Sequence, residues 1–329
     1  MRFLIAGLGS IGRRHLRNLQ ALGESDIVLY RTGRSTLPEE DLTGFAQESD
    51  LQRALSVHQP DAVIVANPTA LHLDVAIPAA EAGCAILLEK PISHSLDRLD
   101  LLENAAARSG SRILMGFQFR FHPSLVRAKE LIAAGNIGRV ISAHVHFGEY
   151  LPGWHPWEDY RLSYAARADL GGGVVLTQSH ALDYLPWLIG QVADVSALTG
   201  RLAELGLDVD DSAEIGLRFA DGALGNVHLD FVQKPPVHEL AVVGTQGVLR
   251  AGLLGEALLV HSHDTDEPRS WPLPAGWERN SMFLDEMRHF IDVAGGKAEP
   301  SCGLRDGIHT QRLIDAIYRS DRGRTVTRP

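Results

Sequence analysis

The amino-acid sequence predicts an α/β protein in two parts, a parallel, doubly wound sheet followed by an α+β domain with an open, mainly antiparallel sheet. Two observations predict the first part: strands alternate with helices over the first third of the chain, and these strands are continuously apolar. A sheet covered by helices on both faces requires such strands. A third observation predicts the second part, because strands with a two-residue period predominate after residue 117.

In the first part, five apolar runs predict strands at residues 3–6, 27–30, 62–66, 85–88 and 113–116. Helices are predicted between them, at residues 11–22, 51–57, 73–81 and 96–108. This alternation is typical of a parallel sheet. We therefore expect a first domain over residues 1–118 and a second domain over residues 119–329.

In the second part, strands are predicted at residues 140–147, 213–219, 223–231, 240–243 and 247–249. Asp221-Gly222 predicts a hairpin turn. Helices are predicted at residues 123–134, 174–188, 282–293 and 304–319. Residues 150–167 form a long irregular segment rich in Trp and Tyr. Loops of this length are usually functional or disordered, and the aromatic content favours an ordered one.

The bulk composition limits the classes of partner. The net charge of −10 over 329 residues argues against nucleic acid or an anionic membrane as the main partner. Cys84 and Cys302 have no metal or redox spacing, which is typical of a reducing cytosol. The chain enters an apolar strand at once, and no apolar run approaches the ~18 residues of a membrane helix. A cytoplasmic protein is therefore expected.

A glycine-rich turn follows the first strand. Gly7 permits a tight turn, Gly9 lets the backbone approach a pyrophosphate, and Gly12 lets the next helix pack closely. The phosphates of a ligand would lie on the first amides of that helix, at Ser10 and Ile11. Because the turn links a strand to a helix, it predicts the dinucleotide site of a Rossmann domain.

The end of the second strand bears on which dinucleotide is bound. An NAD-specific domain carries Asp or Glu there to bind the ribose 2′-hydroxyl, whereas this chain carries Arg31 and Arg34. Arginines form charge-assisted hydrogen bonds with a 2′-phosphate. NADP(H) is therefore favoured as the cofactor, and NAD(H) stays open.

Two further turns should line the cofactor, since ligands of doubly wound sheets bind outside the carboxyl ends of the strands. Asn67, Pro68 and Thr69 directly follow the central strand. His72 lies in the next helical turn, either as a cofactor contact or as a capping and packing residue. The other expected cofactor contacts are Glu89, Lys90 and Gln118.

Lys90 follows a predicted strand and precedes Pro91, which stiffens the turn. A free lysine has a pKa of ~10.4 and is a poor base at neutral pH. Beside an oxidised, cationic nicotinamide, the like charge favours neutral lysine. Lys90 is thus the candidate to accept a proton in alcohol oxidation and to donate one in ketone reduction. The alternative is an ordinary surface lysine.

A second cluster begins with three glycines at residues 171–173. On the predicted helix that follows, Thr177, His180 and Asp183 recur every three residues, so that neighbours share a face. His180 is the candidate to bind a substrate hydroxyl and move its proton. Asp183 could orient or charge it. The alternative is a structural histidine at an interface.

Together with these motifs, residues 119–123 (FRFHP) and 243–247 (VGTQG) make nearly the whole chain resemble the Gfo/Idh/MocA group, named after glucose–fructose oxidoreductase, inositol dehydrogenase and a rhizopine-catabolism protein. The resemblance implies reversible oxidation of a secondary alcohol of a sugar, cyclitol or activated sugar. It also implies homodimers or homotetramers formed through the C-terminal sheet. By position, Lys90 and His180 look like the family's catalytic lysine and histidine. Thr177 stands where the family usually has Asp, and a threonine hydroxyl carries no charge.

Candidate substrate contacts combine aromatic faces with cationic donors. Besides Lys90 and His180 they are Arg120, His122, Trp154, Trp157, Tyr160 and Tyr164. Two other functions stay open, a non-catalytic dinucleotide-binding regulator and a reductase of an imine or enone such as a tetrapyrrole. No metal site is expected. His144 and His146 share one face of a strand, but no third ligand has a diagnostic spacing.

Overall fold

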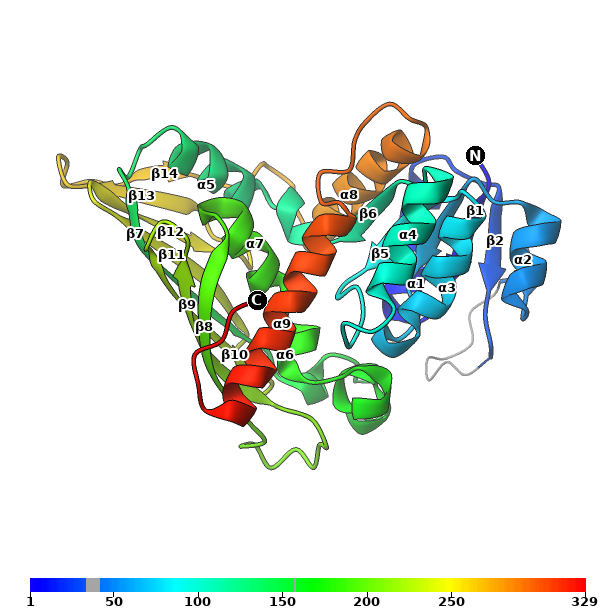
Figure 1. The fold of residues 1–329 in the computed structure, drawn as a ribbon. Coiled ribbons are helices and arrows are strands. Elements are labelled where there is room, and N and C mark those ends of the chain that lie inside the picture. Colours follow the sequence, from blue (N-terminus) through cyan, green and yellow to red (C-terminus); the bar gives the residue numbers. More distant parts are fainter. Residues whose placement is uncertain (34–41, 157) are drawn as a thin grey trace. The chain divides into compact units, whose positions relative to one another are not determined.

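The computed structural model describes residues 1–33, 42–156 and 158–329 (Figure 1). The chain forms two compact units, each built from separated segments. The first unit comprises Met1–Phe117, His155–Gly172 and Phe283–Gln311. The second unit comprises Gln118–Trp154, Gly173–Met282 and Arg312–Pro329. The division of function at residue 118 stays a prediction.

The first unit contains a parallel sheet in the order β3-β2-β1-β4-β5-β6. Its strands are β1 (Phe3–Ala6), β2 (Ile27–Tyr30), β3 (Ala46–Glu48), β4 (Ala62–Val65), β5 (Ala85–Glu89) and β6 (Ile113–Gly116). The side chains of β1 and β4 are fully buried, as a sheet covered on both faces requires. The strand order changes direction between β1 and β4, which is where a doubly wound sheet opens for a ligand. The predicted Rossmann fold is therefore confirmed.

The helices of this unit follow the strands in alternation, as predicted. They are α1 (Ser10–Ala21), α2 (Leu51–His58), α3 (His72–Glu81) and α4 (Leu99–Ser109). The short edge strand β3 was not expected. Its sequence, Ala-Gln-Glu, carries no apolar pattern, and it pairs with β2 only at the border of the sheet.

Segments from the C-terminal half complete the core of the first unit. Met287, Phe290 and Ile308 belong to the same buried cluster as the parallel strands. They come from α8 (Arg279–Ala294) and α9 (Leu304–Gly323). The amide of Met115 in β6 donates a hydrogen bond to the carbonyl of Cys302 at 2.8 Å. The edge of the parallel sheet is thus covered by chain that lies almost 200 residues further on (302 − 115 = 187).

The second unit contains an eight-stranded sheet in the order β14-β13-β12-β11-β7-β10-β9-β8. The strands are β7 (Val140–Gly148), β8 (Val192–Gly200), β9 (Ser212–Phe219), β10 (Leu224–Asp230), β11 (Val237–Gly244), β12 (Gly247–Gly252), β13 (Leu258–Ser262) and β14 (Arg269–Trp271). Neighbouring strands are antiparallel except β7 and β10, which are parallel. The prediction of a mainly antiparallel sheet is confirmed. It missed β8, β13 and β14, which lie at the two borders of the sheet.

Helices cover one face of this sheet (Figure 1). They are α5 (Pro123–Ala133), α6 (Val174–Thr177) and α7 (His180–Ile189), which contact β12, β9 and β10, and β7 respectively. The predicted single helix over residues 174–188 is wrong. The backbone leaves the helical conformation at Gln178, whose side-chain amide donates to the carbonyl of Asp230 at 3.1 Å. His180 therefore begins a new helix, and Thr177 ends the one before it.

The aromatic segment after β7 is ordered as short 3₁₀ turns. They are η3 (Leu151–Gly153), η4 (Tyr160–Leu162), η5 (Tyr164–Ala166) and η6 (Ala168–Leu170). Within the described ranges, no helix is long and apolar enough to cross a membrane.

Candidate active site

The glycine turn in the first unit has the geometry that its spacing predicts. Gly7 has a φ of +95°, and a Cβ there would lie 2.7 Å from the amide nitrogen of Asn67. A Cβ on Gly12 would overlap the carbonyl oxygen of Gly7. By contrast, a Cβ on Gly9 would meet nothing within 4 Å. Gly7 and Gly12 thus allow close packing of backbone, and Gly9 faces open space.

The N-terminus of α1 is left open to an anion. Its N-cap residue is Gly9, which has no side chain to accept a hydrogen bond, and the first turn holds no acidic residue. The first amides of a helix have no partner within the helix and carry a partial positive charge. Ser10 is exposed and Ile11 half-buried at this end. These residues fit the diphosphate of a dinucleotide.

The carboxyl end of β2 presents Tyr30 and Arg31, both half-buried. The main-chain amide of Arg31 donates to the carbonyl of Glu48 at 3.0 Å, which ties this turn to β3. Arg34 lies outside the described residues. The turn itself, Arg31-Thr32-Gly33, holds no carboxylate.

His72 braces the turns that follow β4 and β5. Its Nδ1 lies 2.9 Å from the carbonyl oxygen of Pro91, and its Nε2 lies 3.0 Å from that of Asn67. The ring is buried, and burial holds the pKa of His72 below its usual value. Of the two alternatives, the geometry favours a packing residue over a cofactor contact. Thr69 is also buried, and Pro68 is half-buried.

Glu89 and Lys90, at the end of β5, differ in burial. The Glu89 carboxylate is buried and accepts a hydrogen bond from Nε2 of His15 on α1 at 2.7 Å. Burial raises the pKa of Glu89, but the bond from His15 and the nearby positive charges outweigh it and hold that pKa below its usual value. Glu89 therefore links β5 to α1. Lys90, the next residue, is half-buried.

Sequence reasoning missed one buried carboxyl group in the first unit. Glu286 on α8 is fully buried, and its burial and the charge of Glu89 hold its pKa well above the usual value. Both effects favour the neutral form of this carboxyl group. The sequence could have indicated this buried carboxyl group, because Glu286 lies among Phe283, Met287 and Phe290 on the apolar face of α8.

In the second unit, His180 lies at the start of α7. Nε2 of His180 is 3.4 Å from the side-chain nitrogen of Gln118, which belongs to the 3₁₀ turn η2 (Gln118–Phe121). The ring of Phe119 meets the imidazole edge-on, with 4.8 Å between centroids. Both Gln118 and His180 are almost fully buried. The motif before α5 and the histidine helix, far apart in sequence, are thus brought together.

Arg120 and Asp183 form a buried, bidentate ion pair. Nε and Nη2 of Arg120 donate to the two carboxylate oxygens of Asp183 at 2.9 and 2.6 Å. The side chains are 6% and 2% exposed, so the pair is shielded from solvent. The sequence predicted a substrate contact for Arg120 and a partner of His180 for Asp183. The structure instead pairs these two residues with each other. Thr177 is buried at the end of α6.

His122 caps α5 from within the core. Its Nδ1 accepts a hydrogen bond from the amide of Ser124 at 3.1 Å. The ring is fully buried between Phe119 and Trp277. Burial lowers the pKa of His122 to about 4. The imidazole is therefore neutral in the folded protein, and its position supports the core.

The aromatic candidates are divided between the two units. Trp154 packs edge-on against Phe231 in the second unit, with 5.6 Å between ring centroids. Tyr160 and Tyr164 are half-buried in the first unit. Gly171, which follows the last of these 3₁₀ turns, lies close to the turn after β4. A Cβ on Gly171 would lie only 2.9 Å from the Cβ of Thr69. Trp157 lies outside the described residues.

Family models match both parts of the chain. A model described as an oxidoreductase family with an NAD-binding Rossmann fold matches residues 1–117. A model of the GFO/IDH/MocA C-terminal domain matches residues 125–250. The chain therefore belongs to the Gfo/Idh/MocA family of oxidoreductases, as its motifs predicted.

Relatives of known name support this assignment over most of the chain. Levoglucosan dehydrogenase of Pseudarthrobacter phenanthrenivorans is 29% identical, over 84% of this chain and 82% of the relative. Myo-inositol 2-dehydrogenase of Thermotoga maritima is 26% identical, over 93% of this chain and 92% of the relative. Both are named as dehydrogenases of a sugar derivative or a cyclitol.

Solved structures share the fold. Levoglucosan dehydrogenase in complex with NADH superposes with a TM-score of 0.87 at 22% identity, covering 100% of this chain and 98% of that one. The WlbA dehydrogenase from Bordetella pertussis, in complex with NADH and UDP-GlcNAcA, gives a TM-score of 0.82 at 25% identity, with the same coverage. Structures with NADH bound are thus known for this fold.

The glycine geometry predicts different outcomes for two alanine variants. Gly12→Ala forces a shift in the backbone of Gly7, so it lowers the thermal midpoint and abolishes dinucleotide binding. Gly9→Ala has room for its methyl group, so the midpoint stays within ~2 °C while dinucleotide affinity falls at least about tenfold. Thermal denaturation and calorimetric titration measure the two effects. Equal midpoints for the two variants would contradict this account.

Removing one partner of the buried ion pair should be costly. Arg120→Met removes the bidentate partner of the buried Asp183 carboxylate, which lowers the free energy of unfolding by ~3–5 kcal/mol. The double variant Arg120→Met/Asp183→Leu, which buries no charge, should recover a large part of that loss. Urea denaturation gives both values. A single variant within about 1 kcal/mol of the original protein would refute the pairing.

Stability should fall in weakly acidic solution because of His122. Its folded pKa of about 4 lies below the ordinary value of 6.5, so between these pH values the unfolded chain binds the additional proton. The free energy of unfolding therefore decreases as pH falls from 6.5 towards 4, by up to ~3 kcal/mol from this residue. His122→Asn keeps an N-cap and should flatten that slope in denaturation curves. The exposed-site control His94→Asn should leave the slope unchanged.

Proposed function

We propose that this chain is an NAD(P)-dependent dehydrogenase that interconverts a secondary alcohol and a ketone on a sugar, cyclitol or activated sugar. One observation carries the proposal: the glycine turn after β1, the Asn67 turn after β4 and Lys90 after β5 line one edge of the parallel sheet. Ligands of doubly wound sheets bind outside that edge. The names of the levoglucosan and inositol dehydrogenases support the substrate class.

The cofactor would be held by backbone more than by side chains. Gly7, Gly9 and Gly12, with the amides of Ser10 and Ile11, would hold the diphosphate. The turn at residues 67–69, braced by His72, would lie along the next part of the dinucleotide, which leaves Lys90 at the nicotinamide end. When bound, the nicotinamide supplies or accepts the hydride.

Lys90 is the proposed general acid and base. Its amine would accept the proton of the substrate hydroxyl during oxidation, and its ammonium form would return a proton during reduction. The neighbouring Glu89 is engaged by His15 and buried, so its charge helps to fix the turn from which Lys90 projects. Glu89 is thus proposed as a positioning residue as well as part of the cofactor-binding edge.

His180 is the proposed partner for the substrate hydroxyl. Gln118 beside it would orient the imidazole through the contact at 3.4 Å. Thr177, in the family's usual Asp position, could donate or accept a hydrogen bond but carries no charge. Asp183 forms an ion pair with Arg120. We therefore propose that Asp183 holds the first turn of α7, from which His180 projects, in place.

Substrate contacts are proposed from the aromatic segment. Trp154, Tyr160 and Tyr164 are only partly buried and offer flat faces and hydroxyl groups to a sugar ring, and Trp157 lies in the same segment. We propose supporting positions for Arg120 and His122, because both are buried and hydrogen-bonded within the second unit.

We further propose that NADP(H) is preferred over NAD(H). The turn after β2 offers Arg31 and no carboxylate to the adenosine ribose, which favours a 2′-phosphate.

We also propose that residues 1–118 bind the dinucleotide and residues 119–329 bind substrate and form a homodimer or homotetramer. Leu198 and Leu224 on the sheet face opposite the helices are 68% and 50% exposed, which supports an interface there. The two cysteines are free and buried, which supports a reducing, cytoplasmic compartment.

Lys90→Met tests the reaction class. With a panel of sugars and cyclitols that includes levoglucosan and myo-inositol, kcat/KM should fall by ~10²–10⁴, while calorimetry still detects dinucleotide binding. The control Lys297→Met alters an exposed lysine and should retain full activity. Dinucleotide binding with no turnover of any panel member would instead indicate a regulator. Turnover of an imine or enone that survives Lys90→Met would indicate the other reductase.

Cofactor preference is tested by fluorescence titration with NADPH and NADH. The original protein should bind NADPH more tightly. Arg31→Ala should weaken NADPH binding by about tenfold, because one charge-assisted contact is lost, and leave NADH binding unchanged. Tighter binding of NADH by the original protein would overturn the preference.

A further inference from the structure

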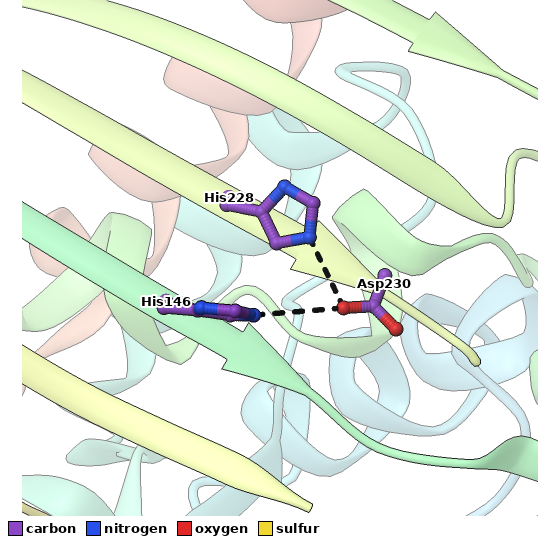
Figure 2. Close-up of side chains that lie close together, drawn as sticks. All are labelled: His146, His228 and Asp230. Atoms are coloured by element: carbon purple, nitrogen blue, oxygen red, sulfur yellow. Dashed lines mark hydrogen bonds and ion pairs between the residues drawn. The ribbon is translucent and has the colours of Figure 1, made fainter. Parts of the chain in front are cut away.

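Three ligating side chains converge on the sheet of the second unit (Figure 2). His146 projects from β7, and His228 and Asp230 project from β10. Each offers one ligand atom, and all three atoms lie within 4.8 Å of one another. This cluster takes no part in the function proposed above.

The pairing of two parallel strands creates the cluster. His146 lies opposite His228, and Gly148 lies opposite Asp230. Residues two apart in a strand project from the same face, so the four positions form a square on the sheet. A Cβ on Gly148 would overlap the Asp230 carboxylate and lie 2.5 Å from the Cβ of Gln233. The glycine therefore leaves the space that the carboxylate occupies.

Asp230 is fixed in orientation by its own main-chain turn. The carboxylate is 4% exposed, and its Oδ1 accepts hydrogen bonds from the amides of Val232 and Gln233 at 2.8 and 2.6 Å. Its Oδ2 is directed at the histidines, 3.1 Å from Nε2 of His228 and 3.8 Å from Nε2 of His146.

A fourth side chain contacts the other ring nitrogen of His228. Glu214, on the neighbouring strand β9, lies 2.6 Å from Nδ1 of His228. In the neutral tautomer that donates its Nδ1 proton to Glu214, Nε2 has a lone pair free for a metal ion. Such carboxylate–histidine pairs orient the ligands of protein metal sites.

His146 supplies the second lone pair. Its Nε2 is buried and has no hydrogen-bond partner among the described residues. Two imidazole nitrogens and one carboxylate oxygen thus face the same small volume. Electron-rich atoms at these separations repel one another unless a proton or a metal cation lies between them.

We propose that His146, His228 and Asp230 bind a divalent transition-metal ion of the zinc class. Bonds of ~2.0–2.2 Å to nitrogen and oxygen place two ligand atoms on one ion up to about 4 Å apart. Oδ2 of Asp230 meets this limit with both histidines, at 3.1 and 3.8 Å, and all three ligand atoms lie within 4.8 Å of one another. Two imidazoles and one carboxylate are donors for zinc, cobalt or iron and not for calcium or magnesium. In the single chain the side chains of His146 and His228 are 42% and 32% exposed, so the coordination can be completed by water or by a group from a second copy across the interface proposed for this sheet face.

The alternative needs no metal. A protonated His228 between Glu214 and Asp230 would form an ordinary pair of ion contacts. The two accounts differ at His146, which is a ligand in one and a bystander in the other.

Metal titration of the full-length protein tests the site. Protein freed of metal by EDTA, which is then removed, is titrated with Co²⁺ by visible absorption and with Zn²⁺ in competition with a chromophoric chelator. We expect one ion per chain. His146→Ala and His228→Ala should each weaken Zn²⁺ affinity at least ~100-fold, and Glu214→Ala about tenfold.

His144→Ala is the matched control. His144 lies two residues before His146 on the same face of β7, and its Nε2 is 3.3 Å from the hydroxyl oxygen of Ser142. This variant should bind Zn²⁺ within about twofold of the original protein. Circular dichroism of the metal-free variants checks their folding. If His228→Ala does not fold, His146→Ala decides alone, because its Nε2 bonds to no described residue. Failure of the original protein to bind Zn²⁺ below about 100 µM, or equal affinity in His146→Ala, would overturn the proposal.

Discussion

The close approach of two glycine backbones determines where the first unit can hold a ligand. Because neither Gly7 nor Gly12 has a side chain, α1 begins directly at the end of β1, with its first amides at the carboxyl edge of the sheet. The other features of that edge depend on this placement. α1 also carries His15, which reaches Glu89 and so fixes the end of β5 immediately before Lys90.

Each unit handles its buried charge differently. In the second unit, Arg120 and Asp183 neutralise each other through a bidentate contact. In the first unit, the contact with His15 lowers the pKa of Glu89, whereas burial and the charge of Glu89 raise the pKa of Glu286. Burying an unpaired carboxylate costs far more than binding a proton. The two shifts therefore favour a negative charge on Glu89, beside the proposed cofactor edge, over one on Glu286.

The sequence predicted the layers well and the borders poorly. The five predicted parallel strands, which include the border strand β6, were found because their side chains are apolar throughout, whereas β3 and β14 are short border strands without that pattern. Local contacts such as the Gly7 turn follow from spacing alone. The Arg120–Asp183 pair and the Gln118–His180 contact join residues about 60 positions apart, which no local periodicity reveals. The break in the predicted helix at Gln178 was not predicted for the same reason, because it is accompanied by a hydrogen bond from the Gln178 side chain to Asp230, which is distant in sequence.

The return of the chain to the first unit has a consequence for synthesis on the ribosome. The parallel strands are all made by residue 116 of this sequence, yet Met287, Phe290 and Ile308, which belong to the same buried core, are made only after all eight strands of the second unit. Until then β6 lacks the contact to Cys302 and presents an uncovered edge. The core of the parallel sheet can therefore close only after these later segments have been made, and the nascent chain depends on them for protection from aggregation.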